Sequence, residues 1–123
     1  MAINPIIHMI GGAFQTTDNS PHTIITIPTT STHAYYVRAV VAARDASSGE
    51  SGAFEIAGAF ENTSSVVLQV STTAAYLSKQ EASWAGLSFA VSAGNILVQV
   101  AGPGAGGPTI DWSAYAEIVE NRV

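Results

Sequence analysis

The chain has 123 residues, of which 47% are hydrophobic and only 11% are charged, and its formal net charge is −5. With four basic residues in all, it cannot form the basic patch that offsets phosphate charge, which argues against nucleic-acid binding. It has no cysteine, which excludes disulfides and thiolate chemistry. No apolar run reaches the ~18–20 residues of a membrane span, so no membrane partner is expected.

The first part of the chain is expected to be separate from the main domain. Residues 1–22 are predicted to form an N-terminal arm or short strand, and residues 23–123 a single β-sandwich domain. Within the arm, residues 3–10 could form either a short strand or an extended arm. The pair Gly11 and Gly12 is expected to end that segment, because glycine pairs are typical of turns.

Two long segments, residues 34–44 and 53–62, alternate between polar and apolar side chains with a period of two. Side chains of a strand point alternately to opposite faces, so these segments are predicted to form an antiparallel pair of half-buried strands. The register that we expect places Arg44 opposite Glu55. The same register places Arg38 opposite Glu61, and two cross-strand ion pairs would then oppose a slip.

The remaining strands follow at regular spacing. Residues 72–83 are interpreted as a loop that could hold one helical turn, and the glycine-rich residues 102–108 cannot form a strand. Seven to eight strands separated by turns predict an all-β fold, an antiparallel β-sandwich of jelly-roll-like type. The further strands are expected at residues 23–27, 66–71, 84–92, 95–101 and 109–120.

The sequence shows no catalytic or metal-binding pattern. His8, His22 and His33 lack the spacing of metal ligands, although symmetry-related histidines of an oligomer could still hold a metal. Ser88 lies in a segment superficially similar to a nucleophile turn, but in the middle of an expected strand. The carboxylates show no sign of facing a cleft, as paired hydrolytic acids would. We therefore predict no enzyme activity, no cofactor and no metal.

The low charge suggests that much of the surface is covered in the functional state. A soluble domain usually has roughly 25% charged residues. A lone monomer with so few charges would be poorly protected against self-association. Copies of the same chain or another partner are therefore expected to cover large areas.

One part of the chain resembles a known family. A strand that leads into a glycine-rich loop, followed by a strand of the type T-I-x-W-x-A, is similar to small β-sandwich modules of tailed-bacteriophage virions. These modules occur in tail fibres, receptor-binding proteins and head decoration proteins. The loop at residues 102–108 is longer than the family pattern. The residues that carry the resemblance are Leu97, Gln99, Ala101, Gly102, Thr109, Ile110, Trp112 and Ala114.

The resemblance implies a non-enzymatic virion protein, commonly a homotrimer. The length favours a capsid decoration (cement) protein that binds the major capsid protein and stabilises the shell, because 123 residues leave little beyond one sandwich. The alternative is a tail fibre or receptor-binding module that recognises a host surface or glycan. The residues expected at an interface are Ile6, Ile7, Met9, Phe14, Tyr76, Trp84 and Tyr115.

Overall fold

The computed structural model describes residues 6–79, 86–102 and 108–122, and within them every regular element is a β-strand. This confirms the all-β, antiparallel class. No helix in the described residues is long and apolar enough to cross a membrane. The strands are β1 (Ile6–Thr16), β2 (His22–Pro28), β3 (His33–Asp45), β4 (Ser51–Asn62), β5 (Val67–Gln69), β6 (Ala74–Lys79), β7 (Gly86–Ser92), β8 (Asn95–Ala101) and β9 (Ile110–Arg122).

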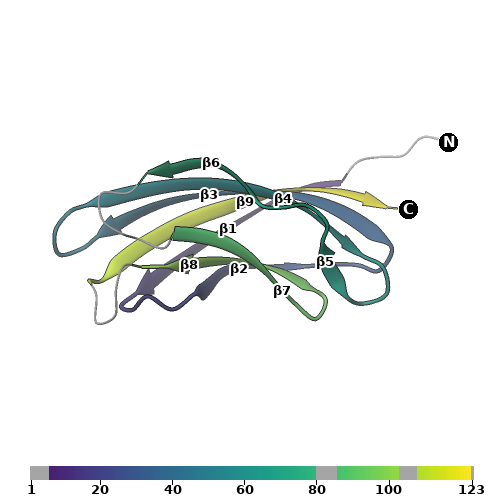
Figure 1. The fold of residues 1–123 in the computed structure, drawn as a ribbon, viewed down its shortest axis with the longest axis horizontal. Coiled ribbons are helices and arrows are strands. Elements are labelled where there is room, and N and C mark those ends of the chain that lie inside the picture. The colour runs from purple at the N-terminus through teal and green to yellow at the C-terminus, as the bar shows by residue number, and fades with distance from the viewer. Residues whose placement is uncertain (1–5, 80–85, 103–107, 123) are drawn as a thin grey trace.

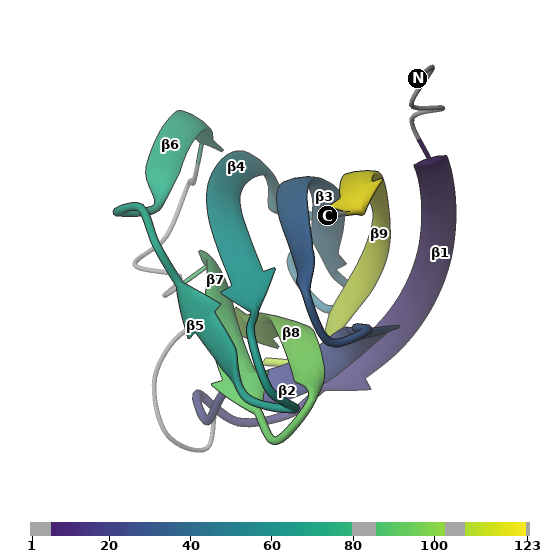
Figure 2. The ribbon, with the colours of Figure 1, turned by 90° about the vertical axis from the view of Figure 1, so that its right-hand side faces the viewer.

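The strands form two sheets (Figures 1 and 2). The six-stranded sheet has the order β1-β9-β3-β4-β5, and β6 also pairs with β4. The three-stranded sheet has the order β2-β8-β7 and lies against one face of the larger sheet. The described residues thus hold nine strands, one more than the upper limit of the seven to eight expected, because β6 lies in a segment that we interpreted as a loop. The jelly-roll class stays a prediction.

The core lies between the two sheets and follows the alternation of the sequence. On β3, the side chains of Tyr35, Val37, Ala39, Val41 and Ala43 are buried, as the period of two predicts. Burial of a large apolar side chain contributes about 1.5–3 kcal/mol, so this face anchors the larger sheet on the smaller one. The other sheet supplies Ile25, Ile27, Ile96, Val98 and Val100, and β4 and β9 supply Phe54, Ile56, Phe60, Ile110, Trp112, Ala116 and Ile118.

The register of β3 and β4 differs from the expected one. Arg44 lies opposite Ser51 rather than Glu55, a shift of four residues. Because the shift is even, each side chain stays on the expected face. The expected pair of Arg38 with Glu61 is also wrong, since Arg38 bonds diagonally to Glu55 with 2.9 Å between Nε and Oε2.

The turn after β3 explains the shift. The carboxylate of Asp45 accepts hydrogen bonds from the backbone N–H of Ser47 at 2.7 Å and of Ser48 at 3.2 Å. Aspartate side chains commonly bond to the backbone two residues on and so start a turn. The chain therefore reverses directly after Asp45, and β4 begins at Ser51, two residues before the strand expected at residues 53–62.

Strand β1 continues through the glycine pair that was expected to end it. It pairs with β9 from Ile6 to Thr16 without a register shift. A Cβ atom on Gly12 would lie 2.4 Å from the backbone oxygen of Ile24 on β2. Gly12 therefore lets β1 pass close to the backbone of the smaller sheet.

We predict that Gly12→Ala destabilises the fold by about 1–3 kcal/mol, because backbone must move to admit the methyl group. Gly11→Ala is the matched control, since its Cβ would be 3.7 Å from the backbone oxygen of Ala114, an ordinary contact. The control should leave stability unchanged or raise it by about 0.4–1 kcal/mol. Urea unfolding of the two variants measures the difference. Equal stabilities would contradict the close approach of β1 and β2.

Candidate interaction surface

The face of the six-stranded sheet that points away from the three-stranded sheet, the outer face, carries a row of exposed apolar side chains. Ile7 lies opposite Val119, Val119 opposite Tyr36, and Tyr36 opposite Ala59. The backbone N–H of Val70 bonds to the oxygen of Ala59 at 2.9 Å and extends the row. Of these, Ile7 is 64% exposed, Val70 55%, Tyr36 43% and Val119 37%. We call the five residues Ile7, Val119, Tyr36, Ala59 and Val70 the apolar row.

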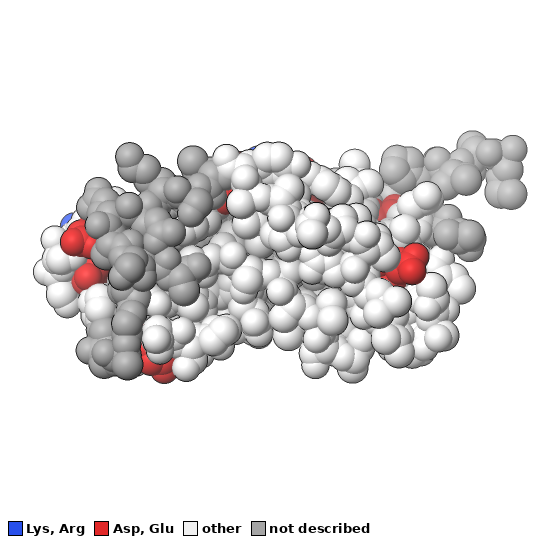
Figure 3. Space-filling model, viewed as in Figure 1, with Lys and Arg blue, Asp and Glu red and all other residues white. Residues whose placement is uncertain are grey.

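The apolar row adjoins an open hollow of about 300 Å³ whose lining includes Ala34, Tyr36, Ala59, Val70 and Val119. Charged groups are sparse over much of the molecule. Figure 3, a view from the side of β6 and β7, shows few charged groups there, and the acidic groups gather mainly near the two ends. Large exposed apolar side chains that lie side by side are typical of a contact with another molecule.

Three charged groups near the row are linked to one another, while Glu61 also lines the hollow. The guanidinium of Arg38 bonds to Glu55 at 2.9 Å and lies 3.7 Å from Glu117, all three side chains being partly exposed. The hydrogen bond to Glu55, followed by its charge, raises the pKa of Arg38. These ion pairs join β3, β4 and β9, and so this cluster adds little net charge to the outer face.

Two tyrosines lie on either side of β4. Tyr36 on β3 is 43% exposed and Tyr76 on β6 is 63% exposed. Their hydroxyl groups interact, and the pKa of Tyr36 is raised, first by partial burial and then by the neighbouring Tyr76. Together they present aromatic surface beside Arg38 and Glu55.

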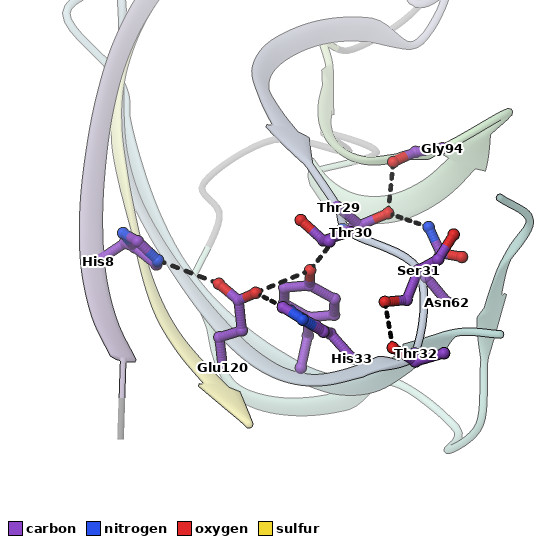
Figure 4. Close-up of polar contacts among 10 residues, drawn as sticks. His8, Thr29, Thr30, Ser31, Thr32, His33, Asn62, Gly94 and Glu120 are labelled. Atoms are coloured by element: carbon purple, nitrogen blue, oxygen red, sulfur yellow. Dashed lines mark hydrogen bonds and ion pairs between the residues drawn. The ribbon is translucent and has the colours of Figure 1, made fainter. Parts of the chain in front are cut away.

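A second polar cluster, the His–Glu cluster, lies at the end of the large sheet (Figure 4). One carboxylate oxygen of Glu120 lies 3.2 Å from Nε2 of His8, and the other bonds to Nδ1 of His33. That second oxygen also accepts a hydrogen bond of 3.1 Å from the hydroxyl of Tyr35. The Tyr35 hydroxyl in turn accepts one of 2.7 Å from the backbone N–H of Thr30. The cluster thus ties β1, β3, β9 and the loop after β2 together.

The electrostatics of the His–Glu cluster follow from these bonds. Burial raises the pKa of the Glu120 carboxyl, but the hydrogen bonds from His33, His8 and Tyr35 together outweigh it and lower the pKa below its ordinary value. Burial, with the nearby carboxylate of Glu120 adding to it, raises the pKa of Tyr35. An ionised carboxylate held by several donors stabilises the folded state.

The arrangement offers no metal site. The imidazole nitrogens of His8 and His33 each face a carboxylate oxygen of Glu120 and do not converge on a common point. His22 faces Asp18 at 2.8 Å. Among the residues that the structure describes, no three His, Cys, Asp or Glu side chains are grouped to hold a metal ion.

The structure distributes the interface residues expected from the sequence over several places. Ile7 and Met9 lie on β1, and Tyr76 lies on β6 at the far side of the same sheet. Trp84 lies outside the described residues. Ile7 is 64% exposed, Met9 66%, Tyr76 63% and Phe14 38%, whereas Ile6 and Tyr115 are half-buried.

The sequence analysis missed most of the apolar row. In the alternating segment of residues 34–44, Tyr36 belongs to the set of side chains that points away from the core. This alternation was the signal that could have identified Tyr36 as a surface residue. Val119 and Val70 gave no such signal, because their place beside Tyr36 depends on pairing between distant strands.

Comparison with known proteins finds a likeness of fold only. No family model matches the chain, and no curated protein matches it. The tailspike protein of Acinetobacter baumannii phage AM24 is similar in structure with a TM-score of 0.55 and 10% identity over 97% of this chain. The tailspike protein gp49 of Acinetobacter baumannii bacteriophage Fri1, a capsular polysaccharide depolymerase, has a TM-score of 0.48 and 12% identity over 98% of this chain. The chain spans 26% of the AM24 protein and 20% of the Fri1 protein.

We predict that Glu120→Gln lowers stability at neutral pH by about 1–3 kcal/mol, because buried donors lose an ionised acceptor. The pKa of Glu120 is lower in the folded state. Its stabilisation is therefore complete above the ordinary pKa of 4.5 and declines as the pH falls through and below that value. Urea unfolding between neutral and acidic pH should show the wild type and the variant converging in acid.

The control for this experiment is Glu117→Gln, whose carboxylate is more exposed on the outer face beside Arg38. It should change stability little at any pH, since exposed ion pairs contribute little. A difference between the wild type and Glu120→Gln that persists unchanged in acid would contradict the role given to Glu120.

Proposed function

We propose that this protein is a non-enzymatic structural module of a tailed-phage virion, located in the tail, that packs against a neighbouring subunit through its outer face. The apolar row carries this proposal. Four of its residues belong to four strands that are held in register by continuous backbone pairing, and Val70 is bonded to Ala59, so the row forms a preorganised surface.

The likeness of fold supports the tail location. The AM24 protein is a tailspike, and this chain corresponds in fold to about a quarter of it, 26% by length. A module of this kind would act as one part of a larger tail assembly. The comparisons lend no support to a capsid decoration function, to the major capsid protein as a partner or to a homotrimer.

The energetics favour contact through many weak interfaces. Apolar area removed from water contributes about 25 cal/mol per Å² before the costs of association. When several copies bind at once, modest single contacts add up to stable attachment. A virion offers such repeated sites, and a function of this type requires no chemistry from the chain.

A second candidate function is glycan recognition. Exposed Tyr36 and Tyr76 flank the polar pair of Arg38 and Glu55, and sugars commonly stack on aromatic rings while their hydroxyls bond to such polar groups. We predict that the wild-type protein gives a signal on a glycan array and that Tyr76→Ala loses it. Phe14→Ala, an aromatic change elsewhere on the sheet, is the control. No signal from the wild-type protein would eliminate this candidate.

The outer-face proposal predicts that Val119→Lys reduces incorporation into virions by about tenfold or more, since a charge at a desolvated apolar contact costs upward of 1.4 kcal/mol. Thr26→Lys adds the same charge at an exposed position on the three-stranded sheet and should incorporate normally. Quantitative mass spectrometry of purified virions measures the copy number.

Urea unfolding of both lysine variants shows whether each is folded. Incorporation of folded Val119→Lys at the wild-type level would contradict the outer-face contact. Antibody labelling of virions in the electron microscope tests the location, and labelling confined to the head would contradict the tail assignment and favour capsid decoration.

A further inference from the structure

Strand β1 forms one edge of the six-stranded sheet. It pairs with β9 along one side, over all eleven of its residues and without a register shift. In Figure 2, β1 lies at the outer margin of the sheet, next to β9 and on the side of β9 that points away from β3. Such an edge presents backbone donors and acceptors to which another strand can pair.

The sequence of this edge strand lacks the features, such as charged residues and proline, by which proteins usually protect an exposed sheet edge from pairing with another strand. The sequence of β1, IIHMIGGAFQT, contains no Pro, Lys, Arg, Asp or Glu. The edge strand β2 of the smaller sheet, in contrast, has an irregularity between Thr23 and Ile25 and ends at Pro28. Strand β5 has only three residues. An edge that is long, regular and uncharged is suited to pairing.

Near Gly12 the strand passes close to the backbone of Ile24, so the second half of β1 packs against the smaller sheet. We call the part farther from this contact, Ile6–Ile10, the open half. It includes Ile7 and Met9, which are 64% and 66% exposed.

The open half is close to a palindrome. Read from either end, Ile-Ile-His-Met-Ile presents isoleucine first, a large apolar residue second and His8 in the centre. Antiparallel pairing of two copies about His8 places Ile6 opposite Ile10 of the second copy and Ile7 opposite Met9 of the second copy. A two-fold interface requires this self-complementarity. Apolar pairs directly opposite each other stabilise a sheet.

From this we propose that two copies of the chain pair edge to edge through β1, antiparallel and centred on His8. Each His8 keeps Glu120 of its own chain as a partner, 3.2 Å away, so the pairing of the two copies leaves each imidazole beside a carboxylate. The two large sheets become continuous, and Ile7 at the end of one apolar row adjoins Met9 of the second copy. The inference goes beyond the proposed function and requires a pair, whereas the family resemblance implied three copies.

Cysteine cross-linking tests the pairing, because the natural chain contains no cysteine. His8→Cys places two thiols directly opposite each other, within the Cα separation of about 4.4–6.8 Å that a disulfide spans. Ala13→Cys is the control on the same strand, where the two thiols would be about 33 Å apart at 3.3 Å per residue. Both variants are oxidised at low micromolar concentration and analysed on a non-reducing gel.

We expect His8→Cys to form the linked dimer about 100-fold faster than Ala13→Cys, since paired thiols have a millimolar effective concentration. Equal rates would overturn the pairing. Light scattering of the wild type provides an independent measure and should give a dimer mass that Met9→Lys shifts toward the monomer, because a charge then faces Ile7. A wild-type monomer or trimer would overturn the pairing.

These outcomes leave the outer-face proposal separately testable. Val119 lies away from the open edge, in the row between β1 and β3. Failed cross-linking together with loss of Val119→Lys from virions would refute only the edge pairing. Successful cross-linking with normal incorporation of Val119→Lys would refute only the outer-face contact.

Discussion

The register of β9 between β1 and β3 is the constraint on which the other features of the molecule depend. It places Val119 in line with Ile7 and Tyr36 on one face of the sheet. It places the next residue, Glu120, against His8 and His33 on the opposite face. A slip by one residue would exchange the two faces and destroy the apolar row and the His–Glu cluster together.

Local pattern predicted the faces of strands correctly but not their partners. The alternation around Val37 and Arg38 showed which side chains are buried, because a period of two is a property of one strand. The register of β3 and β4 was wrong, since it depends on the turn that the Asp45 side chain makes with the backbone. Strand β6 was missed because its sequence, AAYLSK, is poor in the β-branched residues that usually mark strands.

The candidate surface was predictable only in part. Ile7, Met9 and Tyr76 were recognised as large apolar or aromatic residues in segments that lacked a clear core role, and all three are exposed. Their spatial relation to Val119 and Val70 depends on pairing between strands far apart in sequence, for which one sequence alone contains no signal. The few charges also could not be assigned partners before the register was known, as Arg38 and Glu55 show.

The position of β1 has a consequence for how the protein is made. The backbone partner of this first strand is β9, the last, so roughly a hundred intervening residues must leave the ribosome before β1 can find its place. Pairing of such distant segments is slow, because the loop that it closes is long. An apolar segment such as Ile6–Ile10 is therefore exposed throughout translation, when premature contact between neighbouring nascent chains would be most harmful.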